Sequence, residues 1–199
     1  MLSKLLSPLD RLLNRFTMYR LLIAYLIGLL VVAFVQNARG AISYPWVALV
    51  VTPLIAVVGA VLVNWIFATV FDAPVNHDSA IITGLILSLI VGPVHNSSDY
   101  VFLAWAAALA MASKYIIAIN HLHLFNPAAI AVVITWLATG STASWWIGTA
   151  SMTPFVIVGG LILVRKIRRA DVVFSFLWSA LFVSLAWSAL DGYSFTHAL

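Results

Sequence analysis

The residues that could recognise a ligand gather where three short apolar segments begin. Each segment opens with side chains that can cap a helix, namely Asp78 and Ser79, Asn126 before Pro127, and Ser151 and Thr153 before Pro154. A capping side chain bonds the free N–H groups of the first turn, and a proline there sacrifices no hydrogen bond. The same N–H groups and the positive end of the helix dipole attract anions such as phosphate. The sequence therefore offers three candidate anion-binding helix ends, with ordinary capping as the alternative interpretation.

Lys114 is a further candidate because it lies within an apolar stretch, residues 99–119. A buried ammonium needs a partner or a cavity, although a lysine side chain can also extend to the membrane surface. Asn64, in another apolar stretch, is expected to hydrogen-bond a neighbouring helix or to line a pathway. The chain has no cysteine, which excludes disulfides and thiolate-held metal or iron–sulfur sites. His121 and His123 lack the helical spacing of metal ligands, so no metal site is predicted.

The elements that must position these residues are apolar helices. The sequence is 64% hydrophobic and only 8% charged, which leaves too little charge to cover a soluble domain. Its apolar runs are continuous rather than alternating, which indicates helices and not barrel strands. Seven segments are expected, at 18–36, 44–71, 79–92, 99–119, 127–139, 154–164 and 171–190. The predicted fold class is an all-α integral membrane protein with about seven helical segments.

Segments 79–92, 127–139 and 154–164 are too short for a hydrocarbon core of about 30 Å, at about 1.5 Å per residue. Short segments flanked by Gly and Pro are typical of the broken helices of transporters. The alternative is that each helix runs a turn further into its polar flanks. In the broken-helix interpretation, the N-termini of all three segments lie inside the protein rather than facing lipid.

Basic residues next to the apolar segments set the expected topology. Lys4, Arg11, Arg15 and Arg20 accompany the start of the first segment, and a second basic cluster occupies 165–169. The positive-inside rule accounts for both clusters, so no nucleic-acid partner is predicted. We expect residues 1–17 to form an amphipathic interfacial helix and 18–199 a transmembrane domain. The predicted location is the cell (inner) membrane, crossed several times, with the lipid bilayer as partner and the N-terminus cytoplasmic.

Two tryptophans mark the expected outer face. Trp145 and Trp146 follow each other in the loop 140–153. Tryptophans concentrate at the membrane–water interface, where the ring is half apolar and the indole N–H can be hydrated. Both are therefore predicted to belong to an aromatic belt.

Three stretches together resemble a known family. The first reads SAIITGLIL at 79–87, the second joins Lys114 and its neighbours to HLFNPAA at 123–129, and the third covers 157–169. In this order they resemble the RnfD/NqrB family, the membrane proteins shared by Rnf electron-transport complexes and sodium-translocating NADH:quinone oxidoreductases. The resemblance implies inverted five-helix repeats, here only partial. It also implies more chain than is present, so a shortened relative or part of a longer protein is expected.

The resemblance further implies a flavin, as FMN or riboflavin, attached through phosphate to a threonine. The matching position is Thr153, but Ala150 and Ser151 depart from the family's attachment pattern and no acidic residue precedes them, so covalent attachment is doubtful. Together with the capping and buried polar groups, the candidate cofactor-binding residues are Thr153, Ser151, Asn126, Ser79, Thr83 and Lys114.

The implied function is electron transfer by a membrane subunit or domain of a flavin-dependent oxidoreductase, with sodium or proton movement as a coupled step. Its partners would be other subunits or a fused reductase domain, because the chain has neither a nicotinamide fingerprint nor cysteines for iron–sulfur clusters. It would act as a component of the enzyme rather than catalyse alone. Two alternatives remain open, a small-solute channel or transporter on a similar scaffold, and a membrane anchor for a reductase domain.

Overall fold

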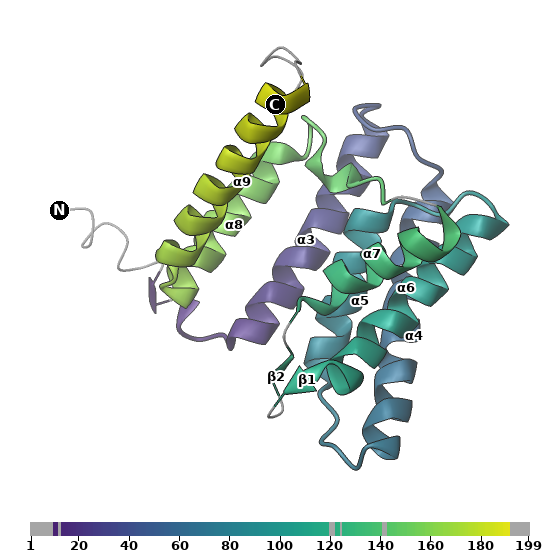
Figure 1. The fold of residues 1–199 in the computed structure, drawn as a ribbon. Coiled ribbons are helices and arrows are strands. Elements are labelled where there is room, and N and C mark those ends of the chain that lie inside the picture. The colour runs from purple at the N-terminus through teal and green to yellow at the C-terminus, as the bar shows by residue number, and fades with distance from the viewer. Residues whose placement is uncertain (1–9, 12, 120–121, 124, 141–142, 192–199) are drawn as a thin grey trace.

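The computed structural model describes residues 10–191 except residues 12, 120–121, 124 and 141–142. In this part of the chain seven α-helices follow one another (Figure 1). They are α3 (Met18–Ala38), α4 (Trp46–Val70), α5 (His77–Val91), α6 (Ser97–Ile116), α7 (Pro127–Thr139), α8 (Thr153–Ile167) and α9 (Ala170–Asp191). The predicted all-helical class is confirmed, and each predicted segment agrees with a helix to within three residues at either end.

Three of the helices are long and apolar enough to cross a membrane, judged by length and composition, and they are α3, α4 and α9. The three segments predicted to be short are short, because α5, α7 and α8 have 15, 13 and 15 residues. At about 1.5 Å per residue, none of them reaches the thickness of a hydrocarbon core. The partial inverted repeat stays a prediction.

The core lies among α4, α5, α6 and α7, and small residues hold its backbones close. Ala56 and Ala60 of α4 are fully buried beside α5. At Gly84 of α5, an added Cβ would lie 2.6 Å from the Cα atom of Val57, which is backbone and cannot swing aside. Small residues at helix crossings allow this close packing in membrane proteins, where dispersion contacts replace the hydrophobic effect between helices.

The α8–α9 hairpin packs beside α3 rather than into this core (Figure 1). Tyr25 of α3 joins the two parts, since its hydroxyl donates to the carbonyl oxygen of Val156 at 3.0 Å. The Tyr25 ring also lies over Gly159, where a Cβ would overlap it. None of the residues of α8 is buried and Pro154 is exposed, but the N-cap residue Met152 is fully buried. The expectation that the N-terminus of this segment lies inside the protein stays a prediction.

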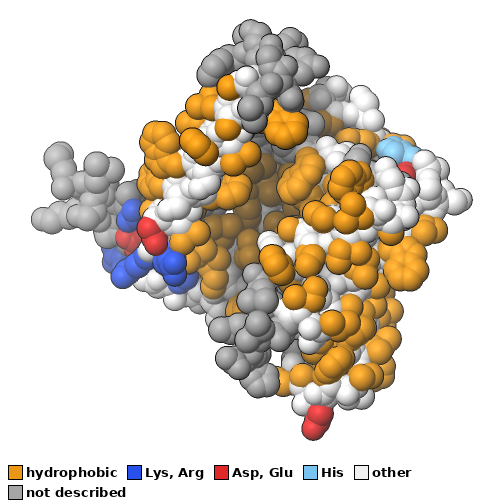
Figure 2. All heavy atoms as spheres, in the orientation of Figure 1, with side chains coloured by type: hydrophobic (Ala, Val, Ile, Leu, Met, Phe, Trp, Pro, Cys, Tyr) orange, Lys and Arg blue, Asp and Glu red, His pale blue; other side chains and the backbone are white. Residues whose placement is uncertain are grey.

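Contacts distant in sequence define the two ends of the bundle. At one end, the Arg165 guanidinium donates two hydrogen bonds of 2.8 Å to the Asp10 carboxylate. This pair joins the described part of the N-terminal segment to the basic cluster 165–169, and Figure 2 shows Lys and Arg side chains gathered there. At the other end, Gln36 at the close of α3 donates to the carbonyl oxygen of Ser151 at 2.9 Å. The side of the membrane that each end faces stays a prediction, and most of the predicted interfacial helix, residues 1–9 and 12, lies outside the described residues.

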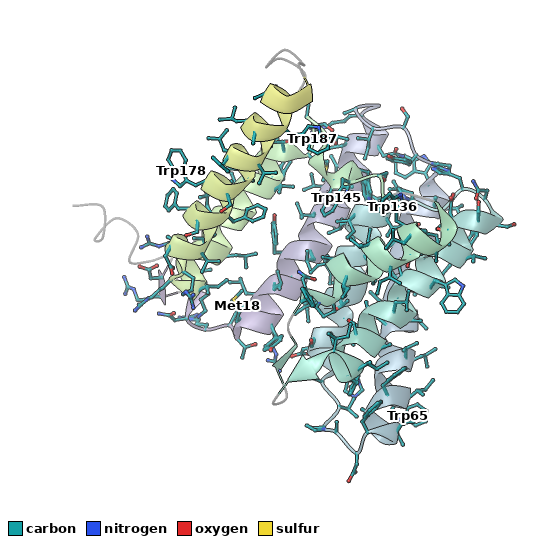
Figure 3. All side chains as sticks on the ribbon, in the orientation of Figure 1. Met18, Trp65, Trp136, Trp145, Trp178 and Trp187 are labelled. Atoms are coloured by element: carbon teal, nitrogen blue, oxygen red, sulfur yellow. The ribbon has the colours of Figure 1, made fainter. Side chains whose placement is uncertain are left out.

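The two tryptophans of the outer loop have different environments. Trp145 is exposed, as an interfacial residue would be, and it lies towards the same end of the molecule as Trp187, whereas Trp65 lies towards the other (Figure 3). Trp146 is 3% exposed, and its indole N–H donates to the carbonyl oxygen of Ser88 at 2.9 Å. The belt prediction is wrong for Trp146, because the loop folds over the end of α5 and buries this ring.

A short antiparallel strand pair separates α6 from α7. It consists of β1 (Ala118–Ile119) and β2 (Leu122–His123). The helix therefore ends at Ile116, before the predicted limit, which places Lys114 in the last turn of α6 rather than well inside it. This position brings Lys114 near the helices that begin at the same end of the bundle.

Candidate functional site

Four helices leave a cavity of about 520 Å³ at the end of the bundle where α3 begins. The described residues that line it come from all four, and they are Met18, Tyr19 and Leu22 of α3, Ser79, Ile82, Thr83 and Ile86 of α5, Lys114 of α6, and Phe125, Asn126 and Pro127 at the start of α7. Met18 marks this level of the bundle in Figure 3. Ligand cavities of a few hundred Å³ are the usual size for small molecules. We call this space the Lys114 cavity.

The ammonium of Lys114 is held at the wall of the cavity by a single serine. Lys114 Nζ donates to the Ser79 carbonyl oxygen at 3.1 Å and to Ser79 Oγ at 3.0 Å. The prediction that a buried lysine needs a partner or a cavity is confirmed in both respects. An ammonium has three N–H donors, and two of them are used by these bonds.

The start of α5 supplies the hydroxyl groups of the cavity. Asn76, rather than Asp78 or Ser79, caps the helix, because its side-chain oxygen accepts from the Ser79 N–H at 3.0 Å and α5 begins at His77. One turn further on, the Thr83 hydroxyl donates to the Ser79 carbonyl oxygen at 2.8 Å. The Ser79 hydroxyl accepts from Lys114 and keeps its own O–H for a further acceptor.

The start of α7 closes another side of the cavity. Asn126 caps the helix as predicted, accepting from the N–H groups of Ala128 at 3.0 Å and Ala129 at 3.4 Å. Pro127 occupies the first turn, where it needs no donor. The N-termini of α5 and α7 thus lie at one cavity, and their dipoles add positive potential to the Lys114 charge.

No carboxylate neutralises this positive charge within the part of the chain that the structure describes. The two ion pairs in the described part of the chain join Arg165 to Asp10 and Arg169 to Asp171, and neither involves Lys114. Asp78, in the first turn of α5, is exposed and does not line the cavity. The oxygens that meet the Lys114 ammonium are therefore neutral, and the cavity is electrically suited to an anion.

A hydrogen bond to α4 fixes the position of the residue next to Lys114. Tyr115, next to Lys114, donates its hydroxyl to Asn64 Oδ1 of α4 at 3.0 Å. Asn64 lies six residues before the end of α4 at Val70, or about 9 Å along the helix. The interhelical hydrogen bond predicted for Asn64 is confirmed. The Tyr115 hydroxyl is therefore anchored inward of the end of α4, whereas the cap residues of α5 and α7, Asn76 and Asn126, are exposed.

The other two predicted cofactor residues, Ser151 and Thr153, lie at the opposite end. Ser151 is tied to Gln36, which is 18 residues, or about 27 Å, along α3 from Met18 at the Lys114 cavity. Thr153 is the first residue of α8, and its hydroxyl donates to the Thr149 carbonyl oxygen at 2.9 Å. The predicted capping role is wrong here, because the residue at the N-cap is Met152 and no side chain caps this helix.

The chain was compared with protein families, curated proteins and solved structures. No family model, curated protein or solved structure matches it. The resemblance to the Rnf and quinone-reductase membrane proteins therefore rests on the three sequence stretches alone and stays a prediction.

Sequence reasoning missed the contribution of α3 and one buried donor. Tyr19 and Leu22 of α3 line the cavity, but their spacing is that of any apolar helix, so no sequence signal marks them. Asn64 Nδ2 is buried and has no hydrogen-bond partner among the described residues. A buried donor without a partner is rare and calls for an explanation, such as a function or a bound water. The hydrogen bond from Tyr115 sets the orientation of the Asn64 side chain, and nothing in the sequence indicates that these two residues are in contact. His121 lies outside the described residues.

Proposed function

We propose that this protein is an integral membrane protein that binds an anionic, phosphate-bearing ligand in the Lys114 cavity. The observation that carries the proposal is the position of Lys114, a half-buried cation on the cavity wall whose hydrogen bonds go to neutral oxygens of Ser79. Anions lie favourably at helix N-termini, and broken helices in membrane proteins point such N-termini at the anionic groups of their substrates.

A phosphate group matches the donors of the Lys114 cavity better than a monatomic anion does. The third Lys114 N–H and the Ser79 hydroxyl are two donors available from different directions. A phosphate group offers three oxygens and binds several donors at once, with charge-assisted bonds roughly twice as strong as neutral ones. Lys114 is half-buried, and a partly buried charge is screened by salt less than a charge at the surface.

The electron-transfer function is the form of this proposal that the resemblance favours. FMN would be held through its phosphate by Lys114 and Ser79, with Asn126 at the start of α7 beside it. When bound, the flavin would supply the redox chemistry, and other subunits or a fused reductase domain would supply and accept the electrons. Covalent attachment at Thr153 is not supported by this arrangement, since Thr153 lies at the opposite end of the bundle from the cavity.

Transport of a small anion is the second candidate. It is favoured by the short helices α5 and α7, whose N-termini border the same cavity, because broken helices of this kind form substrate sites in transporters. The membrane-anchor hypothesis differs from both, since it requires no ligand in the cavity.

A titration tests the proposal and separates these functions. Purified full-length protein is titrated with FMN and, separately, with inorganic phosphate, and so are Lys114→Gln and the matched control Lys166→Gln, whose ammonium donates to Asn14 at the same end of the bundle. We expect Lys114→Gln to weaken binding by on the order of tenfold or more, the loss of one charged hydrogen bond, and Lys166→Gln to leave it unchanged.

The ligand that binds decides between the forms of the proposal. FMN binding that is lost on denaturation supports electron transfer, whereas phosphate binding without FMN binding supports anion transport. Flavin that stays on the denatured chain and disappears in Thr153→Val would place the cofactor at the other end and contradict the proposal. Equal affinities of wild type and Lys114→Gln would contradict it as well.

A further inference from the structure

A second, apolar space of about 450 Å³ runs between α3 and α8. Tyr25, Gly28 and Val32 of α3 and Phe155 and Val158 of α8 are among the residues that line it. The hydroxyl of Tyr25 is already engaged with the carbonyl oxygen of Val156. Figure 2 shows the molecular surface hollowed between α8–α9 and the other helices, with hydrophobic side chains on its walls. We call this space the α3–α8 groove.

The Lys114 cavity and the groove lie along one face of α3, with Tyr25, which contacts Val156 and Gly159 of α8, between Leu22 of the cavity and Gly28 of the groove. Met18 and Leu22 line the cavity, and Tyr25, Leu29 and Val32 line the groove. These five positions are separated by alternate steps of four and three residues, which places them along one side of a helix. From Met18 to Val32 the side is about 21 Å long, more than the roughly 15 Å of one leaflet's share of the hydrocarbon core. The charged cavity and the apolar groove therefore follow one another along this face of α3.

We propose that the ligand of the Lys114 cavity is an anionic lipid, with its phosphate head group at Lys114 and one hydrocarbon chain in the α3–α8 groove. The inference rests on the proposed function, because it uses the same anion site, and it names a lipid as the phosphate-bearing ligand in place of FMN or a free anion. The part of α3 that lines the groove, from Tyr25 to Val32, is about 10 Å long. The groove presents no unpaired polar group to a hydrocarbon chain, and a water-soluble anion would leave it unused. The charge of Lys114, which no described carboxylate meets, selects an anionic head group over a zwitterionic one.

The groove is a fixed feature because its two walls are joined. Tyr25 bonds Val156 and packs on Gly159 at one level. Asp10 bonds Arg165 at the end of α8, nearer the level of the cavity. Gly28 lies about one turn beyond Tyr25, towards the Gln36 end of α3, and faces open space, since an added Cβ there meets no atom within 4 Å. A larger side chain at this position would enter the groove without disturbing the packing or the Lys114 cavity.

The test compares three ligands on the full-length protein and its variants. The ligands are 1-oleoyl lysophosphatidic acid, glycerol 3-phosphate, which has the head group alone, and 1-oleoyl lysophosphatidylcholine, which has the chain with a zwitterionic head group. The variants are Gly28→Leu, which fills the groove, Lys114→Gln, which removes the charge, and Gly160→Leu, a matched control on α8 where an added Cβ also meets nothing. Affinities are measured by native mass spectrometry and by titration in detergent.

We expect lysophosphatidic acid to bind on the order of tenfold or more tightly than either other ligand, because each of its two parts contributes binding free energy. Gly28→Leu weakens binding of this lipid by about tenfold, the equivalent of roughly two buried methylenes, and leaves glycerol 3-phosphate unchanged, which also shows that the variant is folded. Lys114→Gln weakens both phosphate ligands, and Gly160→Leu affects neither.

Other results separate the two proposals. If glycerol 3-phosphate binds as tightly as the lipid and Gly28→Leu has no effect, the lipid inference is wrong and the anion site stands. If the lipid binds equally well to wild type and Lys114→Gln, the chain alone is recognised and the inference is wrong. If no phosphate ligand depends on Lys114, the proposed function fails together with the inference.

Discussion

Lys114 and Ser79 are 35 residues apart in the sequence, yet Lys114 Nζ lies 3.0 Å from Ser79 Oγ and 3.1 Å from the Ser79 carbonyl oxygen. The contact joins the last turn of α6 to the first turn of α5 at a cavity that the start of α7 also borders. A cation that is partly removed from water and faces neutral acceptors loses hydration free energy that an ion pair would return. Such an arrangement is costly for the ligand-free protein and favourable for binding an anion.

The first prediction follows from this cost. Replacing the ammonium in Lys114→Met is expected to leave the apparent melting temperature of the ligand-free protein in detergent unchanged or to raise it, because an uncompensated cation is exchanged for an apolar side chain. The neighbouring variant Tyr115→Phe is the control. It removes the hydroxyl that Asn64 Oδ1 accepts and should destabilise the protein by about 1 kcal/mol. A marked fall in the melting temperature of Lys114→Met would mean that Lys114 stabilises the fold rather than a ligand.

The second prediction concerns the crossing of α4 and α5. In Gly84→Ala the new Cβ would lie 2.8 Å from the Ala56 carbonyl oxygen and 2.6 Å from Val57 Cα. Both contacts are backbone, so the helices must move apart, and we expect a loss of about 1–3 kcal/mol, as for other overpacked cores. Gly160→Ala, with open space around its Cβ, should be neutral or slightly stabilising because alanine favours helix. Thermal unfolding in detergent measures both, and equal melting temperatures would contradict the close crossing.

The third prediction is a pH dependence of the contact between the N-terminal segment and α8. The hydrogen-bonded Arg165 guanidinium holds the pKa of the Asp10 carboxyl below its usual range, and this effect outweighs the opposing effect of desolvation. A carboxyl whose pKa is lowered by folding stabilises the contact above its unfolded pKa, near 3.9, and this stabilisation is lost as the pH falls through the lower folded value. A fluorescent label in Phe16→Cys should therefore gain mobility below about pH 4. With Asp10→Asn added, the label should be mobile at every pH. An immobile label in that variant would show that the ion pair does not hold the N-terminal segment against α8.

The fourth prediction concerns orientation in the membrane. The chain has no cysteine, so single substitutions report their own accessibility to a membrane-impermeant maleimide. Arg39→Cys is expected to react from outside intact cells, and Arg169→Cys only after permeabilisation, because basic clusters stay on the cytoplasmic side. Ala150→Cys and Val75→Cys serve as exposed controls for the outer and inner loops. Reaction of Arg39→Cys and Arg169→Cys from the same side would contradict the predicted orientation.

Helix positions were predictable because hydrophobic composition and local caps determine them. Asn126 and Pro127 begin α7 in the sequence and in the structure, since both act on the next turn of the chain. The start of α5 was misplaced by two residues, because Asn76 competes with Asp78 as a cap and local sequence does not decide between them. Trp146 was assigned to an interface although a loop fold buries it, which depends on contact with α5.

The candidate site was predictable only in part. Ser79, Lys114 and Asn126 were identified from separate local signals and Thr83 from the family resemblance, and tertiary packing brings all four to one cavity. Ser151 and Thr153 gave the same kind of signal and lie at the other end, because a capping pattern carries no information about which end of a bundle it occupies. The α3–α8 groove has no counterpart in the sequence, since its walls are apolar residues like those that face lipid elsewhere.

The most direct test of the account is to locate a heavy anion in the protein. Crystals of the full-length protein are soaked in tungstate, a phosphate-like oxyanion, and anomalous density is collected for wild type and Lys114→Gln. The account predicts a peak within hydrogen-bonding distance of Lys114 Nζ and Ser79 Oγ in the wild type and no peak there in the variant. Density only at the basic cluster 165–169, or a cavity peak that persists in Lys114→Gln, would contradict it.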